Sequence, residues 1–244
     1  MEVGKYPGIS IIIPAYNEEK ALERTLLHFL PFKEKYNLEI IVADDASTDR
    51  TVEIAERFAD KVVLNRTGRR ARSGSCNRGV REANYGILFF LDADILVEEP
   101  DSLFSKVYEV FRDESVIGGM LNYKVYPDKE KFSDRVTHAF WNAVMRLVLK
   151  FGYGVSTPGI QIVKKAAFNR IGGYDENLRL IQDVDLFLRL SRIGKIRFFS
   201  GLYILESPRR YRDEGYLIYA YRSTLRWYNI LFKHRSYGEY KTVR

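Results

Sequence analysis

Two aspartates close together follow an apolar run in this chain. The stretch Gly86–Val97 (GILFFLDADILV) carries Asp92 and Asp94 with only Ala93 between them. In an extended segment, residues i and i+2 lie on the same face, so both carboxylates can approach one point. Such hard oxygen ligands suit Mg²⁺ or Mn²⁺, which are commonly held by one or two carboxylates together with substrate phosphates. The spacing therefore indicates a divalent-metal site; a strand followed by a solvated acidic turn is the alternative.

Alternating strands and helices in the first half must position these aspartates. Asn17 is a plausible N-cap for the first helix, and Ser47 or Asp49 for the second. This alternation predicts an α/β protein whose mostly parallel sheet is covered by helices on both faces. The predicted strands are Ser10–Ile13, Glu39–Ala43, Lys61–Leu64, Ile87–Leu91 and Val116–Met120, and the helices are Glu18–Leu30, Thr51–Phe58, Ser75–Ala83 and Leu103–Phe111.

The second half is less regular, and it continues into an aromatic and basic C-terminal stretch. Its predicted helices are Phe132–Leu149, Lys165–Ile171, Asp183–Ile193 and Gly215–Phe232, with a short strand at Gln161–Val163. No repeat or linker divides the chain. We therefore expect one domain over residues 1–212 and a helical extension over residues 213–244.

Polar clusters follow three of the predicted strands. They are Pro14–Glu18 (PAYNE), Asp44–Asp49 (DDASTD) and Asp92–Asp94 (DAD). In open α/β sheets, ligands bind beyond the carboxyl ends of the strands, so these clusters predict a site for a polar ligand and a cation. Neither Gly-x-Gly-x-x-Gly nor Gly-x-x-x-x-Gly-Lys-Ser/Thr follows the first strand, which argues against a dinucleotide-dependent oxidoreductase and a P-loop enzyme.

Composition adds a few limits. The 244 residues carry a formal charge of +7, which favours an anionic partner such as nucleotide phosphates, nucleic acid or a membrane surface. A single cysteine, Cys76, excludes an internal disulfide and fits a reducing compartment. No apolar run is long enough to span a bilayer. We expect a cytoplasmic protein.

Six segments, taken together and in order, resemble the nucleotide-sugar-dependent glycosyltransferases of family 2, which have the GT-A fold. They are Ile11–Glu18, Ile41–Asp49, Asn77–Ala83, Phe90–Asp94, Gly172–Leu178 and Gln182–Leu190. The resemblance implies a Rossmann-like, mostly parallel mixed sheet. It also implies a nucleotide-sugar-binding half, residues 1–120, and an acceptor-binding half with the catalytic base, residues 121–212.

The resemblance assigns the donor site to the strand ends. Pro14, Tyr16 and Glu18 would line the nucleotide pocket, and Asp45 would accept a hydrogen bond from an N–H of uracil or guanine. Asp94 would bind Mn²⁺ or Mg²⁺ directly, while Asp92, beside Ala93, would lie near the ribose or bind the metal through water. Turn formation and helix capping are the alternative roles for Asp44 and Asp45.

The resemblance also assigns a general base. Asp183 would take the proton from an acceptor hydroxyl, although here Gln182 precedes it where the family more often has Glu. Loss of that neighbouring charge would lower the pKa of Asp183 and make it a weaker base. The alternative is that Asp183 only stabilises the start of its helix.

Several arginines could stabilise the leaving nucleoside diphosphate. Arg72, Arg209 and Arg210 are candidates, and solvated surface arginine is the alternative for each. The stretch Tyr216–Arg235 could contact a membrane surface or pack on the protein. Ser223 replaces the Gln of a segment found in processive relatives, so we expect single transfers.

The sequence thus predicts a metal-dependent, inverting glycosyltransferase that moves a sugar from a UDP- or GDP-sugar to an acceptor hydroxyl, with a lipid-linked acceptor as one candidate. A sugar-phosphate nucleotidyltransferase and an inactive donor-binding relative are alternatives. A nucleic-acid binder leaves the acidic strand ends unexplained. If Tyr216–Arg235 meets a membrane, the protein would be peripheral at the inner face of the cell membrane.

Overall fold

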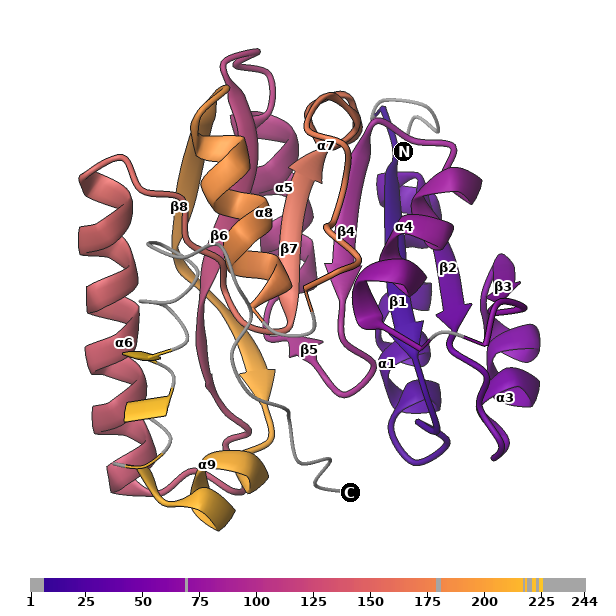
Figure 1. Ribbon diagram of the computed structural model, residues 1–244, viewed down its shortest axis with the longest axis horizontal. Helices are drawn as coiled ribbons and strands as arrows, with labels where there is room; N and C mark the ends of the chain where they lie inside the picture. The colour runs from indigo at the N-terminus through magenta and orange to yellow at the C-terminus, as the bar shows by residue number, and fades with distance from the viewer. Residues whose placement is uncertain are drawn as a thin grey trace.

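A computed structural model describes residues 7–68, 70–178 and 181–216, together with residues 218, 221, 222, 224 and 225; for residues 209–211 it describes the backbone alone. The chain forms a layered α/β structure around one mixed sheet (Figure 1). None of the helices in this described part of the chain combines the length and the apolar character that a membrane crossing requires.

The sheet has eight strands in the described residues, in the order β3-β2-β1-β4-β7-β6-β8-β5. The pairs β2–β3, β1–β2, β1–β4 and β6–β8 are parallel, whereas β7 and β5 pair antiparallel with their neighbours. The strands are β1 Ile9–Ala15, β2 Leu38–Asp44, β3 Lys61–Leu64, β4 Ile87–Leu91, β5 Leu96–Val97, β6 Val116–Val125, β7 Ile160–Lys164 and β8 Lys195–Glu206.

Helices cover both faces of the sheet. Because side chains alternate along a strand, Ile11 and Ile13 of β1 pack into one hydrophobic core and Ile12 packs into the other. Helices α1, α2, α3 and α5 contribute to the first core, and α4, α6, α7 and α8 to the second. The helices are α1 Leu22–Phe29, η1 Leu30–Phe32 (a 3₁₀ turn), α2 Lys33–Tyr36, α3 Thr51–Phe58, α4 Arg72–Glu82, α5 Pro100–Val110, α6 Phe132–Lys150, α7 Lys165–Arg170, α8 Gln182–Ser191 and α9 Arg209–Glu214.

The predicted fold class, a mostly parallel mixed sheet between two helical layers, is confirmed. Two local predictions are wrong. The first helix begins at Leu22 rather than near Glu18, and Asn17 does not cap it: Asn17 adopts a left-handed φ of 53°, and its Oδ1 accepts from the backbone N–H of Thr48 at 2.7 Å. Strand β8 and helix α9 were not predicted. The predicted helix Gly215–Phe232 lies largely outside the described residues.

Candidate active site

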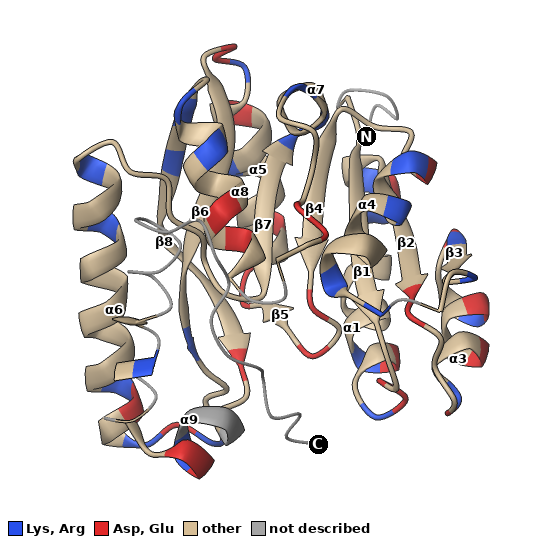
Figure 2. Cartoon of the chain, viewed as in Figure 1, with Lys and Arg blue, Asp and Glu red and all other residues tan. Residues whose placement is uncertain are grey.

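The predicted site residues gather where the loops after β1, β2 and β4 approach helices α4 and α8. Acidic residues appear on the loop that follows β4 and on the first turn of α8, and basic residues appear on α4, on the other side of β4 from α8 (Figure 2). The carboxyl ends of parallel strands and the N-terminus of a helix thus meet in one region, the place where α/β proteins bind ligands.

Arg72, at the start of α4, connects the two halves of this site. Its Nε donates to Oδ1 of Asp92 at 2.7 Å, and its Nη2 donates to Oε1 of Gln161 at 3.0 Å. The same Gln161 oxygen accepts from the hydroxyl of Tyr174 at 3.0 Å. Burial would lower the pKa of Arg72, but the charges of Asp92 and Asp183, among others, outweigh burial and raise it. Arg72 is therefore a cation paired with Asp92 whose charge also acts on Asp183.

Asp183, the predicted base, lies in the first turn of α8. Burial raises the pKa of its carboxyl, and the negative charge of Asp92 adds to that effect, while the Arg72 guanidinium and backbone N–H groups oppose it. A carboxylate with a raised pKa is a stronger base than an exposed aspartate. Burial thus acts on the pKa of Asp183 in the direction opposite to the loss of a neighbouring charge at position 182.

The residues just before Asp183 have an unusual conformation. Ile181 has φ of 58° and ψ of 29°, a left-handed conformation that is costly for a β-branched residue. The Nε2 of Gln182 donates to the backbone oxygen of Leu178 at 2.9 Å. Its Oε1 is buried and has no hydrogen-bond partner among the described residues. Backbone strain of this kind persists only where the surroundings impose it, and it often occurs at functional sites.

Hydrogen bonds connect α8 to α4 through the loop that follows α7. The guanidinium of Arg189 donates to Oδ2 of Asp185 at 2.6 Å and to the backbone oxygen of Gly173 at 2.8 Å. On the other side, Oδ1 of Asn77 accepts from the Tyr174 N–H at 3.0 Å, and Nδ2 of Asn77 donates to the Tyr174 oxygen at 3.0 Å. The loop after α7 therefore fixes the position of Asp183 relative to Arg72.

Asp45 is buried after β2 and faces α4. Its Oδ1 accepts from Nη2 of Arg78 at 3.0 Å and from Nδ2 of Asn65 at 2.8 Å. Asp44 takes the turn-forming role instead: its Oδ2 accepts from the backbone N–H groups of Ala46 and Ser47. Asp45 is thus held in one orientation by two side chains.

The loop after β1 lies beside these groups. The Tyr16 hydroxyl accepts from Arg70, whose guanidinium also lies 4.7 Å from the centre of the Tyr16 ring. The backbone N–H of Glu18 donates to Oγ1 of Thr51 at 2.7 Å, which joins this loop to α3. Pro14 lies within β1, opposite Ala43 of β2. These residues surround the end of β1, where the sequence predicted a nucleotide pocket.

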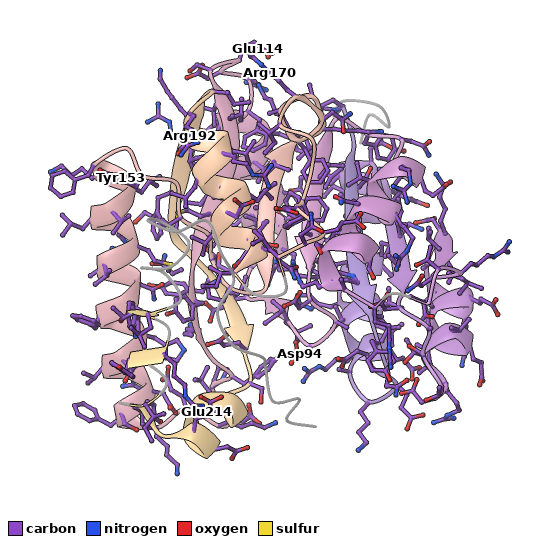
Figure 3. All side chains as sticks on the ribbon, in the orientation of Figure 1. Asp94, Glu114, Tyr153, Arg170, Arg192 and Glu214 are labelled. Atoms are coloured by element: carbon purple, nitrogen blue, oxygen red, sulfur yellow. The ribbon has the colours of Figure 1, made fainter. Side chains whose placement is uncertain are left out.

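Asp94 lies on the loop between β4 and β5, and Figure 3 labels its side chain at the lower edge of the sheet. Side chains from other elements hold the backbone of this loop. The Tyr126 hydroxyl donates to the Asp94 backbone oxygen at 2.8 Å, and Oγ1 of Thr25 donates to the Ala93 backbone oxygen at 2.6 Å. Its half-buried position orients Asp94 without withdrawing it from solvent.

The donor atoms fit a metal that is shared with a substrate. In the described part of the chain, no group of three or more His, Cys, Asp or Glu side chains could hold a metal ion by itself. Asp92 and Asp94 supply two hard carboxylates, and Oδ1 of Asp92 is already paired with Arg72. Mg²⁺ and Mn²⁺ commonly complete such a partial set with phosphate oxygens and water.

The remaining candidates are two arginines whose side chains are not described and one cysteine that takes no part in the site. Arg209 and Arg210 lie in α9, but their side chains fall outside the described atoms. Cys76 is buried, and burial raises the pKa of its thiol to about 12, so it is a packing residue. The sequence interpretation missed the polar partners Arg78, Gln161, Tyr174 and Arg189. Arg78, Tyr174 and Arg189 lie inside the segments Asn77–Ala83, Gly172–Leu178 and Gln182–Leu190, which were the available signal.

The fold is that of the GT-A glycosyltransferases. The mannosyltransferase PcManGT from Pyrobaculum calidifontis, solved with GDP-Man and Mn²⁺, aligns with a TM-score of 0.66 at 22% identity, over 89% of this chain and 64% of that chain. TarS 1–349 from S. aureus, solved with UDP-GlcNAc, aligns with a TM-score of 0.59 at 18% identity, over 80% and 57% of the two chains.

The sequence comparisons identify the family within this class. The model described as "Glycosyl transferase family 2" matches residues 10–172, and the chain belongs to that family. The probable glycosyltransferase YdaM of Bacillus subtilis (strain 168) is 27% identical over 209 residues, which are 80% of this chain and 49% of YdaM. The dolichol-phosphate mannosyltransferase of Pyrococcus furiosus is 34% identical over 112 residues, 45% of this chain and 31% of that protein. The chain thus spans half or less of the length of these curated relatives.

Proposed function

We propose that this protein is a metal-dependent, inverting glycosyltransferase that moves a sugar from a UDP- or GDP-sugar to an acceptor hydroxyl. One observation carries the proposal: the half-buried Arg72 pairs with Asp92 and its charge also acts on Asp183, at the edge of the sheet where Asp45 and Asp94 follow their strands. Family membership supports it, as do the GDP-Man and Mn²⁺ bound to PcManGT and the UDP-GlcNAc bound to TarS.

The donor would occupy the ends of β1, β2 and β4. The Asp45 carboxylate, oriented by Arg78 and Asn65, would accept the N–H of uracil or guanine. Pro14, Tyr16 and Glu18 would line the pocket for the base and ribose. Asp94, with Asp92, would hold Mn²⁺ or Mg²⁺, which when bound would neutralise the charge of the diphosphate.

Asp183 would act as the general base. Its carboxylate would accept the proton of the acceptor hydroxyl as that oxygen forms a bond to the anomeric carbon. The bond from that carbon to the diphosphate oxygen breaks in the same step, and the nucleoside diphosphate leaves with the electron pair. Burial supports this role because it raises the pKa of Asp183, while Arg72 keeps the group ionised enough to accept a proton.

Cations would assist the departure of the diphosphate. Arg72 already pairs with Asp92, so in this proposal it mainly holds that carboxylate and sets the charge of Asp183. Arg209 and Arg210 would supply charge to the leaving group from α9. The Oε1 of Gln182, which is buried without a partner among the described residues, would accept a hydrogen bond from a hydroxyl of a bound sugar.

The acceptor could belong to several chemical classes, but its hydroxyl must lie beside Asp183. An acceptor hydroxyl must reach Asp183 from the α8 side, and a lipid-linked, glycan or small-molecule acceptor could do so. We propose a cytoplasmic protein, with peripheral membrane contact through residues 216–235 as the predicted option; that segment lies mostly outside the described residues.

Donor identification tests the proposal. Thermal-shift screening of UDP- and GDP-sugars with Mn²⁺ or Mg²⁺ should find one donor that raises the melting temperature only in the presence of metal, because Asp94 and Asp92 would hold the metal that neutralises the diphosphate. That donor should then release nucleoside diphosphate when an acceptor is added. Release of pyrophosphate from a sugar phosphate and a nucleoside triphosphate would instead identify a nucleotidyltransferase. Donor binding without any transfer would identify an inactive relative.

A further inference from the structure

Helix α6 carries an apolar stripe on its outer face. The helix stands at the side of the molecule, beyond β6 and β8 (Figure 1). Its inner face packs inward through buried residues such as His138, Asn142 and Met145. The outer face repeats apolar residues at intervals of four, four, three, four and four, which is one side of an α-helix. These exposed residues are Phe132, Val136, Phe140, Ala143, Leu147 and Phe151.

The stripe is too apolar for an ordinary solvated surface. Phe132 is 79% exposed, Phe140 60% and Phe151 71%. Single exposed apolar residues are normal, but a contiguous row of this length marks an interaction surface. With 19 residues, α6 offers a row about 28 Å long at 1.5 Å per residue.

The charges beside the stripe are positive. Arg135, Arg146 and Lys150 are exposed on α6, whereas Asp134, its one acidic residue, is fully buried and paired with Arg212. Arg135 pairs with Glu130 at 2.9 Å at the rim of the face, whereas Arg146 donates to the buried Asn122, so its guanidinium turns toward β6. An apolar row with a cationic rim matches the interface of an anionic lipid surface.

Two other occupants fit this charge pattern less well. A second copy of the chain, related by a two-fold axis, would place the same cationic rims against each other. The end of this chain, residues 226–244, contains five Lys or Arg residues and one Glu, so it too would bring positive charge to a positive rim. Only an anionic partner offers complementary charge.

We infer that α6 docks this protein on an anionic lipid surface, with the stripe inserted at the level of the headgroups. The docked face is connected to the candidate site. His138 of α6 lies 2.9 Å from Oε1 of Glu206, the Glu206 backbone oxygen accepts from the Tyr126 N–H at 3.3 Å, and the Tyr126 hydroxyl donates to Asp94. The inference does not rest on the proposed function, because it concerns binding in the absence of donor and acceptor.

Vesicle co-sedimentation tests this inference directly. The full chain should bind vesicles of phosphatidylcholine with phosphatidylglycerol, and more weakly those of phosphatidylcholine alone. Replacing Phe140→Glu together with Leu147→Glu should lower binding by about tenfold or more, since two exposed apolar side chains that would insert into the lipid are replaced by negative charges. Phe140→Ser with Leu147→Ser, which adds no charge, should lower it as well.

The matched control places the same change elsewhere on the surface. Leu27 and Leu64 are 45% and 44% exposed, on α1 and β3. Leu27→Glu with Leu64→Glu should leave vesicle binding unchanged, and thermal melting should confirm that all variants are folded.

Three outcomes would overturn the inference. The first is an unmodified chain that does not bind the anionic vesicles, or α6 variants that bind them as well as it does. The second is a dimer in light scattering that the Phe140 and Leu147 changes dissociate, which would make a second copy the occupant. The third is protection of Phe140 from carbene labelling in the vesicle-free monomer, which would show that the chain covers the stripe itself.

Discussion

The two halves of the molecule hold their candidate site carboxylates in different ways. In the first half, Asp44 and Asp45 lie on a turn where backbone N–H groups and the Arg78 and Asn65 side chains bond to them. In the second half, Asp183 lies on a helix behind the strained Ile181, and burial raises its pKa. The first half orients its acids through hydrogen bonds, which suits the proposed role in donor binding. In the second half burial raises the pKa of the acid, which suits the proposed role of a general base.

Asp183→Asn gives the largest expected effect, and it separates the two halves. Asparagine keeps the size of the side chain but cannot accept a proton, so the transfer rate should fall by about 10²–10⁴-fold. Donor affinity, set in the first half, should stay nearly unchanged when measured by calorimetry. Asp213→Asn, an exposed change on α9, is the matched control. A normal transfer rate in the Asp183→Asn variant would show that Asp183 is not the general base.

Gly154→Ala tests how tightly the second half positions its helix. A Cβ at Gly154 would lie 1.8 Å from the backbone oxygen of Phe187 in α8, so the loop or the helix must move. We expect a loss of about 3 kcal/mol in the free energy of unfolding, measured by urea denaturation. Gly86→Ala, where an added Cβ meets nothing within 4 Å, should change it by less than about 0.5 kcal/mol. Equal stability of the two variants would contradict this packing.

Arg72→Gln should sharpen the electrostatic difference between the halves. Arg72 lowers the pKa of Asp183 against the effect of burial, so its removal should raise that pKa further. The base would then be protonated over a wider range, and the acidic limb of the pH profile of kcat should move to higher pH. Arg81→Gln, an exposed change on the same helix, should leave the profile in place. If the acidic limb stays at the same pH in the Arg72→Gln variant, Arg72 does not set the pKa of Asp183.

Glu206→Gln gives the smallest effect. Burial lowers the pKa of His138, but the hydrogen bond and charge of Glu206 outweigh burial and raise it. A raised pKa in the folded state means that this pair contributes stability below the ordinary pKa of about 6.5, and that the contribution disappears as pH rises through the raised value. The variant should lose about 1–3 kcal/mol at acidic pH and little at alkaline pH, measured by thermal melting across pH. A loss that is the same at every pH would contradict the charged pair.

The sequence predicted the first half better than the second for a physical reason. Strand β4 is buried on both faces and reads as a continuous apolar run, and Ile87–Leu91 was predicted with the observed bounds. The strand Lys61–Leu64 and the helix Thr51–Phe58 were also predicted with the observed bounds. Strand β8 alternates exposed and buried residues irregularly, and Gly201 with φ of 80° accompanies a register shift against β6. The sequence of β8 therefore lacks the regular alternation that would predict a strand.

The site shows the same division between local and long-range information. Asp92, Asp94 and Asp183 stand in short local patterns, so the sequence could suggest them. Their partners come from distant positions: 89 residues separate Arg72 from Gln161, and 33 separate Asp45 from Arg78. Such pairs exist only once the sheet order is known, and no local spacing reveals them.

Calorimetry with the donor found by thermal shift tests the central claim most directly. With Mn²⁺ present the protein should bind that sugar nucleotide, and either removal of the metal with a chelator or the change Asp94→Asn should weaken binding by at least about tenfold, or about 1.4 kcal/mol. Binding of equal strength with and without metal, in both the unmodified protein and the Asp94 variant, would contradict the account.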